Sequence, residues 1–290
     1  MTRRTARNIS LAFLLCLLAL VGYAFWAAHQ QDQAQQNQLS LRVIDVQHGD
    51  CMLLTEPGGQ TMMIDTGQSF AKTAIAQTLE ELHIDTIDIL ILTHPHNDHI
   101  GSASWLIENY TVGEVHQIPC GRDSDAYRTL QQTIADKQIK TVEIHAGDTF
   151  SFGQAACEYL GPIHPDPDDL NNASAILRMQ YGERTFLFMG DAKSAAESDL
   201  MSSNLAALRA DVLKVGHHAR KSTSTVFLKA VQPSYAIVSL DKPSTYEDAD
   251  EQAEVFDAIE SCGAQLYRTD QDGTILLRTD GKTITVQTET

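Results

Sequence analysis

The chain carries a cluster of histidines directly after a short apolar run. Residues 87–92 read Ile-Asp-Ile-Leu-Ile-Leu, which is typical of a buried strand, and residues 93–99 follow as Thr-His-Pro-His-Asn-Asp-His. Histidines two residues apart at the end of an extended run can point their rings to the same side. Imidazoles and a carboxylate are ligands that borderline divalent metals such as Zn²⁺ bind. The segment therefore favours a metal site over a loop of surface histidines, with four candidate ligands: His94, His96, Asp98 and His99.

Two further apolar runs end in residues that bind metals. Residues 212–215 lead into Gly216-His217-His218, and residues 185–189 lead into Gly190-Asp191. A rigid sheet that delivers side chains at several strand ends is what a preorganised metal site requires. For Asp191 by itself, an N-cap of the following helix is an equally good interpretation. Taken together, the three strand ends favour the ligand interpretation.

Strand-like and helix-like segments alternate through the rest of the chain. Apolar residues make up 43% of it and charged residues 20%, which suffices to bury a core. Short apolar runs are separated by Gly, Asp and Pro turns, and helical spacing predicts helices at 70–82, 100–110, 123–138 and 250–261. We expect stacked sheets covered by helices, α/β or α+β in class, within one domain at residues 39–290.

The first 38 residues are expected to form a separate unit. Residues 11–28 are apolar and uncharged, and Arg3, Arg4 and Arg7 precede them. At about 1.5 Å per residue, a helix of this length nearly spans the roughly 30 Å hydrocarbon core of a membrane. Basic residues on one side only place the amino end in the cytoplasm and the rest outside. We expect an uncleaved transmembrane anchor followed by a polar tether, or a cleaved signal segment; either makes the protein extracytoplasmic, membrane-anchored or secreted.

Charge and cysteine content exclude two classes of protein. With 21 Lys and Arg against 38 Asp and Glu, the formal net charge is −17, which argues against a protein that holds duplex nucleic acid by charge. Five cysteines are too few for a disulfide scaffold. The four outside the apolar segment allow disulfides, and free buried cysteines are an equally good interpretation: Cys51, Cys120, Cys157 and Cys262.

The order of these motifs resembles the metallo-β-lactamase fold superfamily. Ile64-Asp65-Thr66-Gly67 matches its first motif, residues 94–99 its second, and Gly190-Asp191 and Gly216-His217-His218 its later ones. More narrowly, the chain is similar to the extracytoplasmic metallo-hydrolase domain of ComEC-type DNA-uptake proteins and their free-standing relatives. The segments that carry this likeness are residues 45–50 (Asp-Val-Gln-His-Gly-Asp), 171–178, 213–218 (Leu-Lys-Val-Gly-His-His) and 267–274.

The resemblance implies a four-layer αβ/βα sandwich with a one- or two-metal site at one edge of the sheets. Asp65 would orient ligand histidines from behind. By position, two divalent ions, Zn²⁺ or Mn²⁺, would be shared among the following ligands: His94 and His96 for the first ion, Asp98 and His99 with His217 or alternatively His218 for the second, and Asp191 as a bridge.

Two departures from the family pattern concern the ligands and the edge of the site. Many superfamily members supply a third histidine to the first ion, whereas here Asn171 occupies the ComEC-like position, and an amide oxygen is a weak ligand; His164 is an alternative. The family's later Tyr-Gly-His-Pro is residues 246–249, Tyr-Glu-Asp-Ala, so a histidine at the edge of the site is missing; Asp248 replaces it, or alternatively the substrate pocket has changed.

Two shorter departures lie in the loops. The Gly-Ser that follows the histidine pair in the family is Ala219-Arg220 here, and Gln47-His48 replaces the Gly-Gln of the family's D-V-G-Q-G-D. These changes bear on efficiency and substrate more than on the fold.

The resemblance implies a metal-dependent hydrolase that acts outside the cytoplasmic membrane, with metal-bound hydroxide attacking a phosphorus or carbonyl centre. Asp98 is expected to orient the water. His218 is expected to contact the leaving group or substrate, or alternatively to make a structural hydrogen bond. Phosphodiesters are the leading substrates, single-stranded DNA among them, and a membrane channel is a partner to consider. The alternative is a non-catalytic metal- or partner-binding module of the same fold at the cell surface.

Overall fold

The computed structural model describes residues 20–23, 26, 37–119, 121–165, 168–241 and 249–289. The chain divides into a first unit, Met1–Gln38, and a second unit, Leu39–Thr290. Most of the apolar segment at 11–28 lies outside the described residues, so the transmembrane anchor stays an expectation. Among the residues that are described, no helix has both the length and the apolar character needed to cross a membrane.

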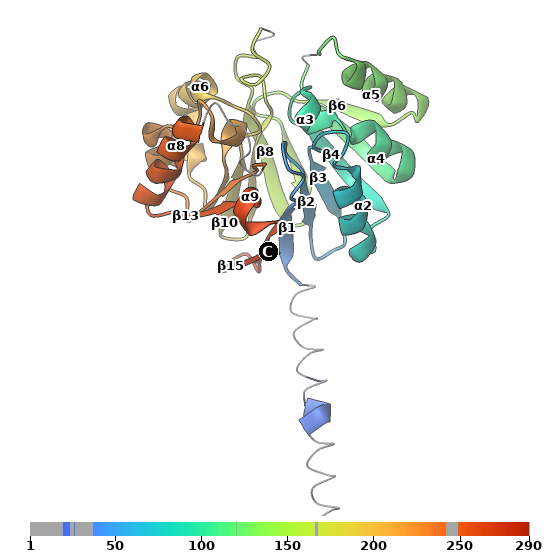
Figure 1. Ribbon diagram of the computed structural model, residues 1–290, viewed down its shortest axis with the longest axis horizontal. Coiled ribbons are helices and arrows are strands. Elements are labelled where there is room, and N and C mark those ends of the chain that lie inside the picture. Colours follow the sequence, from blue (N-terminus) through green and yellow to red (C-terminus); the bar gives the residue numbers. More distant parts are fainter. Residues whose placement is uncertain are drawn as a thin grey trace, which may run out of the picture. The chain divides into compact units, whose positions relative to one another are not determined.

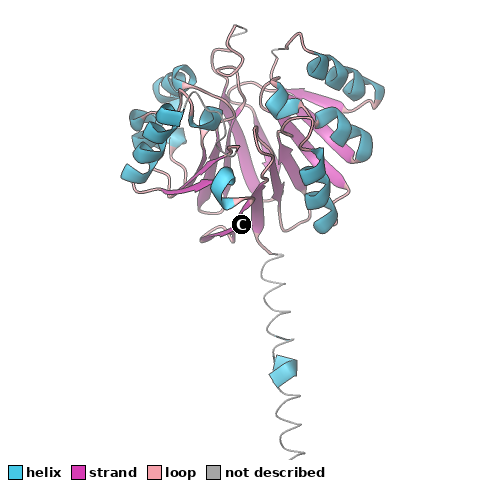
Figure 2. Ribbon diagram, viewed as in Figure 1, coloured by secondary structure: helices cyan, strands magenta, loops and turns pink. Residues whose placement is uncertain are grey.

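Two sheets form the centre of the second unit, with helices on their outer faces (Figures 1 and 2). The first sheet contains, in spatial order, β15 (Ile284–Thr288), β14 (Ile275–Thr279), β1 (Leu39–Val43), β2 (Met52–Thr55), β3 (Thr61–Ile64), β4 (Thr86–Leu92), β5 (Thr111–Gln117) and β6 (Lys140–Glu143). The second contains β13 (Gln265–Arg268), β12 (Tyr235–Val238), β11 (Val212–Lys214), β10 (Arg184–Phe188), β9 (Ile176–Tyr181), β8 (Ala155–Gly161) and β7 (Thr149–Phe152). The two-sheet α/β architecture expected from the sequence is confirmed.

Each sheet is parallel in one part and antiparallel in the other. Strands β3 to β6 run parallel in the first sheet, and strands β10 to β13 run parallel in the second. The carboxyl ends of parallel strands lie at the same edge of a sheet, and this is where open α/β sheets hold their ligands. The polar residues that follow β4, β10 and β11 are therefore placed at sheet edges.

The helices cover the sheets from outside. The first sheet is accompanied by α2 (Lys72–Glu81), α3 (Asn97–Ile100), α4 (Ala103–Asn109) and α5 (Asp125–Asp136). The second is accompanied by α6 (Ser194–Asn204), η1 (Leu205–Leu208), η2 (Gly216–Ala219), α7 (Thr225–Val231), α8 (Ala249–Ser261) and α9 (Thr269–Asp272). Ser124 caps α5 by accepting a hydrogen bond from the Tyr127 backbone, which is why the helix begins there.

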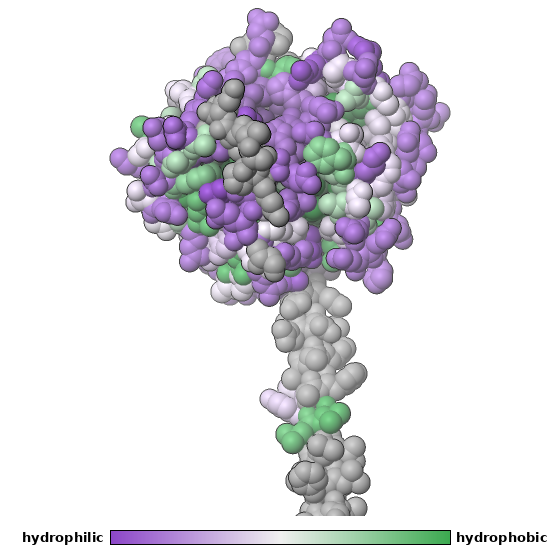
Figure 3. All heavy atoms as spheres, viewed as in Figure 1, coloured by the Kyte–Doolittle hydropathy of each residue, from purple (hydrophilic) through white to green (hydrophobic). Residues whose placement is uncertain are grey.

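Three apolar clusters separate the resulting four layers. One lies between the two sheets and includes Leu41, Met52 and Phe186. The others lie under the helices, around Leu53 beside the first sheet and around Phe227 beside the second. Burying one such side chain contributes about 1.5–3 kcal/mol, so these clusters provide the rigid frame for the sheet edges. The face shown in Figure 3 is mainly hydrophilic, with small separate apolar patches.

Candidate metal centre

Polar residues from both sheets meet at one place. His94, His96, Asp98 and His99 follow β4 of the first sheet, whereas Asp191 and the pair His217-His218 follow β10 and β11 of the second. Among the described residues, ligand atoms from these segments form groups whose members lie within 4.8 Å of one another. The site therefore exists only because the two sheets hold their strand ends against each other.

The larger group contains Asp98, His99, Asp191 and His218. The Nε2 atom of His99 lies 3.2 Å from Oδ2 of Asp191. The Nε2 atom of His218 lies 3.5 Å from Oδ1 of Asp191 and 3.6 Å from Oδ2 of Asp98. Two imidazole nitrogens and two carboxylates thus face a common point, which is a donor set suited to Zn²⁺ and similar ions.

A second group contains His94, His96 and the same Asp191. The Nε2 atom of His94 lies 3.6 Å from Oδ2 of Asp191 and 3.0 Å from Nδ1 of His96. Burial, followed by the charge of His99, holds the pKa of His94 well below its usual range, which favours the neutral imidazole that metals bind. Asp191 belongs to both groups, which is the position that a bridging carboxylate requires.

Two buried atoms test whether a metal fits here. The Nε2 atom of His218 and the Oδ1 atom of Asp191 make no hydrogen bond within the described residues, although they are only 3.5 Å apart. Leaving a buried polar atom without a partner costs about 1–3 kcal/mol. A divalent cation would give both atoms a partner, so the residues present fit the metal that the sequence predicts.

Charges in the larger group strongly stabilise one another. Burial alone would raise the pKa of Asp191, but the charges of His99 and His218 hold that pKa well below its usual range. Burial alone would lower the pKa of His99, but Asp191 and Asp65 raise it well above its usual range. The pKa of His218 is raised in the same way, chiefly by Asp191 and Asp98. Positive charge, on the histidines or on a bound cation, therefore stabilises the buried carboxylates of this group.

Hydrogen bonds from Nδ1 fix the rings of the ligand histidines. Nδ1 of His99 donates to Asp65 at 2.7 Å, and Nδ1 of His218 donates to the backbone oxygen of Ser239 at 3.0 Å. Each bond leaves Nε2 of the same ring facing the group, as in metal sites whose outer partners fix the imidazole tautomer. Asp65 therefore contacts the ring of His99 on the side away from the larger group.

His217 occupies a different position from His218. Its Nδ1 donates to the backbone oxygen of Arg220 at 2.7 Å, and its Nε2 lies 3.1 Å from the Nδ2 of Asn171. With Nδ1 carrying the proton, Nε2 accepts from the Asn171 amide, so its lone pair is already occupied. Of the two histidines, it is therefore His218 that the structure places in the larger group, and His217 with Asn171 lies beside it.

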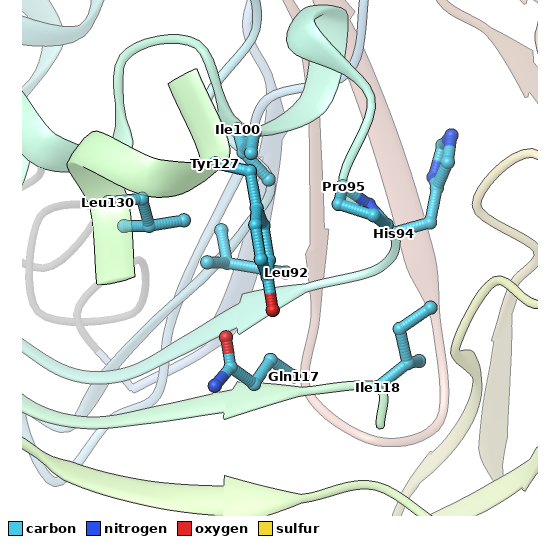
Figure 4. A pocket seen from close by; sticks show the side chains of 8 residues that line it. All are labelled: Leu92, His94, Pro95, Ile100, Gln117, Ile118, Tyr127 and Leu130. Carbon is cyan, nitrogen blue, oxygen red and sulfur yellow. The ribbon is translucent and has the colours of Figure 1, made fainter. Parts of the chain in front are cut away.

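An apolar pocket supports the backbone of the second motif, residues 94–99. Leu92, Ile100, Tyr127 and Leu130 line it together with the backbone side of His94, and Figure 4 shows the imidazole of His94 pointing away from these side chains. The packing of this pocket fixes the direction in which His94 leaves the end of β4.

The turn that carries the histidine pair has an unusual backbone. Its non-glycine residues with positive φ are His217 (45°), His218 (53°), Ala219 (62°), Lys221 (52°) and Thr223 (57°). Each left-handed residue costs on the order of 1–3 kcal/mol, and this conformation persists only where the surrounding structure holds it in place. Three consecutive left-handed residues with side chains, followed by two more at 221 and 223, require strong external support.

Side chains from two helices provide that support. Glu197 of α6 is buried and accepts hydrogen bonds from the backbone N–H groups of Thr223 and Ser224. Gln252 of α8 donates to the backbone oxygen of His218 at 3.0 Å. The helices over the second sheet therefore hold the turn in the conformation that aims His218 at the site.

His48 reaches the site although its role was not anticipated. Its Nε2 lies 3.1 Å from Oδ2 of Asp98, and its ring centre is 5.2 Å from that of His218. The signal in the sequence is the replacement of the family's glutamine by histidine at this position.

Two other candidates lie apart from the groups. His164 is exposed and pairs with Asp199 at 3.1 Å, and among the described residues no metal group includes it. Asp248 lies outside the described residues, so its predicted role at the edge of the site stays a prediction.

Comparison with known proteins agrees with this geometry. A family model described as "Metallo-beta-lactamase superfamily" matches residues 44–240. The chain therefore belongs to the metallo-β-lactamase superfamily. The crystal structure of YhfI from Bacillus subtilis, a metallo-β-lactamase fold protein, has a TM-score of 0.56 and 13% identity over 86% of this chain and 99% of that chain, which shows the shared fold.

Relatives of this chain identify a subgroup within the superfamily. ComE operon protein 3 of Bacillus subtilis is 31% identical over 255 residues, which is 81% of this chain and 32% of that protein. Competence protein ComA of Neisseria gonorrhoeae is 26% identical over 274 residues, which is 91% of this chain and 37% of that protein. Both are ComEC-type competence proteins, so the resemblance seen in the sequence is confirmed. The chain spans about a third of the length of these relatives.

Proposed function

We propose that this chain is a metal-dependent hydrolase that cleaves phosphoester bonds, with a single-stranded DNA phosphodiester as the substrate to test first. The observation that carries the proposal is the sharing of Asp191 between the two ligand groups. A carboxylate common to two groups can hold two cations close together, and paired cations suit in-line displacement at phosphorus. When bound, such cations lower the pKa of water and supply a nucleophile near neutral pH.

Asp98 is the member of the larger group that a substrate meets first. Its side chain is 18% exposed, whereas those of His99, Asp191 and His218 are 3% exposed or less. His48, which contacts Asp98, is 29% exposed. These exposed fractions support entry of the reacting group past Asp98 and His48, and a role for Asp98 in orienting an incoming water.

Local positive charge offsets the acidity of the whole chain. Burial lowers the pKa of His96, and the charge of Arg122 lowers it further. Burial also lowers the pKa of His217; Asp191 and the hydrogen bond to the Arg220 backbone oppose this shift, and the charge of the Arg220 guanidinium adds to it. A guanidinium group thus acts on each side of the site, one beside each ligand segment. This supports an anionic substrate in spite of a net charge of −17.

The test compares metal-loaded wild type with Asp191→Ala. We expect wild type, reconstituted with Zn²⁺ or Mn²⁺, to hydrolyse bis-(p-nitrophenyl) phosphate and to cut single-stranded DNA. Loss of a residue that only hydrogen-bonds to a metal ligand lowers metal affinity or activity about 10–100-fold. Loss of the shared carboxylate itself should therefore reduce turnover at least a hundredfold. Asp199→Ala, at an exposed acid on α6, is the control. Equal cutting by wild type and Asp191→Ala would contradict the assignment.

One observation favours a second candidate function, a non-catalytic metal- or partner-binding module. The smaller group has two histidines and Asp191, and Asn171, which stands where many superfamily members supply a third histidine, is hydrogen-bonded to His217. A weakly held first ion would leave a single-metal site. Stoichiometric metal binding with no hydrolysis of phosphate esters, thioesters or amides would establish this alternative.

We further propose that residues 11–28 anchor the protein in the cytoplasmic membrane, with the second unit outside. Support comes from the uncharged run preceded by three arginines. A membrane channel is the partner that this arrangement would serve, since the relatives are about three times as long as the matched region. Protease added to intact cells should then digest the chain after residue 30, and full protection would contradict the topology.

A further inference from the structure

A fully buried ion pair lies directly behind the larger metal group. The Nζ atom of Lys214 is 2.8 Å from Oδ1 and 2.9 Å from Oδ2 of Asp50, and both side chains are completely buried. Lys214 is the last residue of β11 in the second sheet, and Asp50 precedes β2 in the first. The pair therefore crosses from one sheet to the other at the edge where the candidate ligands meet.

Asp50 is tied to both halves of the metal group. Its backbone N–H donates to the backbone oxygen of Asp98 at 3.2 Å, which fixes it to the ligand segment of the first sheet. Its Oδ1 lies 4.0 Å from Nδ1 of His218, in the turn that begins directly after β11. Through Lys214 and Asp50, the positions of Asp98 and His218 thus depend on each other.

The charges behind the site explain why an ammonium is needed there. Asp50 and Asp65 are both completely buried, and together with His99 they form a third cluster of possible ligand atoms. His99 donates a hydrogen bond to Asp65, and Lys214 donates one to Asp50. Lys214 therefore supplies the positive charge that pairs with Asp50, and without it a buried carboxylate would be left unpaired next to the metal group.

We propose that Lys214 and Asp50 are positioning residues that lock the two sheets together, so that Asp98 and His218 can hold the same metal ion. This inference rests on the metal-binding part of the proposed function and is independent of the substrate. An ion pair that only supported the core would affect stability alone. A positioning pair must also affect the ion held by Asp98 and His218 more than the ion held by His94 and His96.

The experiment compares wild type, Lys214→Met and the double variant Lys214→Met/Asp50→Asn. Zn²⁺ is titrated into metal-free protein, and each binding constant is measured by competition with a chelator. Loss of an outer partner typically costs about 10–100-fold in metal affinity. We expect that loss for the second ion and little change for the first. The double variant leaves no unpaired charge, so it should fold even if Lys214→Met does not.

Crystals of the metal-free proteins give a readout that needs neither metal nor activity. The distance from Nε2 of His218 to Oδ2 of Asp98 should exceed its wild-type value in both variants. The control is Asp211→Asn, which breaks the Arg184 pair at the opposite end of β11 and should leave distance and affinities unchanged. Wild-type distance and wild-type affinities in the double variant would overturn the proposal. Absence of phosphodiester cleavage by wild type would overturn only the proposed substrate.

Discussion

Nδ1 of His99 donates to Oδ2 of Asp65 at 2.7 Å, and both side chains are completely buried. Asp65 also accepts from the backbone N–H and the hydroxyl of Thr93, the residue before His94. One carboxylate thus fixes the ring of His99 and the chain that leads into the second motif. Neither function requires Asp65 to touch a metal.

Asp65→Ala is therefore expected to weaken metal binding without removing a ligand. We expect a loss of about 10–100-fold in affinity for Zn²⁺, because the ring of His99 loses the bond that orients it. Chelator competition on purified protein measures this. Asp85→Ala, an exposed acid just before β4, is the matched control and should bind as wild type does. Unchanged affinity in Asp65→Ala would show that the ring is held by packing alone.

The histidine pair gives a sharper prediction about stoichiometry. Since Nε2 of His218 is unpartnered and Nε2 of His217 accepts from Asn171, His218→Ala should lose one bound ion and His217→Ala should keep both. Metal content after dialysis, measured by mass spectrometry, decides between them. The reverse result would restore His217 as the ligand that the resemblance first suggested.

The turn after the pair carries strain that one substitution can relieve. Ala219 has φ of 62°, where the family has glycine. A left-handed residue with a side chain costs about 1–2 kcal/mol, so Ala219→Gly should raise the free energy of unfolding by about 1 kcal/mol. Ala253→Gly, on the exposed face of α8, should instead lower it by about 0.5–1 kcal/mol. Urea unfolding of metal-free protein measures both, and destabilisation by Ala219→Gly would contradict the strain argument.

Residue types at strand ends made most of the site predictable. The second motif is local in sequence, and the helix expected at 123–138 is observed as α5. Residues 111–117 carried no strand prediction because Gly113 and Glu114 interrupt the apolar pattern. In the structure this strand is β5, and a Cβ at Gly113 would lie 2.6 Å from the backbone oxygen of Asp88, so close strand approach requires glycine there.

Contacts between distant segments were not predictable. Asp50 and Lys214 are 164 residues apart, and no local pattern links an acid in one loop to a lysine at the end of an apolar strand. The choice between His217 and His218 depends on a left-handed backbone, which their residue type does not encode. Residue types at strand ends therefore predict the candidate ligands, whereas the packing of the sheets decides which of them meet.

Glu197 makes stability depend on pH in an unusual direction. Burial raises its pKa above 4.5, although the N–H groups of Thr223 and Ser224 oppose the shift. An acid whose pKa is raised by folding stabilises the folded state below its unfolded pKa, and that contribution is lost as the pH rises through the folded pKa. Relative to Glu197→Gln, wild type should therefore be more stable near pH 4 than at pH 7. Urea unfolding of both proteins at both pH values tests this. The same difference in free energy of unfolding between the two proteins at pH 4 and at pH 7 would contradict it.

Arg122 is expected to contribute to substrate binding and not to metal binding. Arg122 is exposed, and its charge adds to burial in lowering the pKa of His96, a member of the smaller group. For cleavage of single-stranded DNA, Arg122→Ala should raise KM and leave metal content unchanged. Each lost phosphate contact should reduce the slope of log affinity against log salt by about 0.7. Arg128→Ala is the control, because this exposed arginine pairs with Asp123 and Asp125. An unchanged salt slope in Arg122→Ala would mean that the strand does not pass this side of the site.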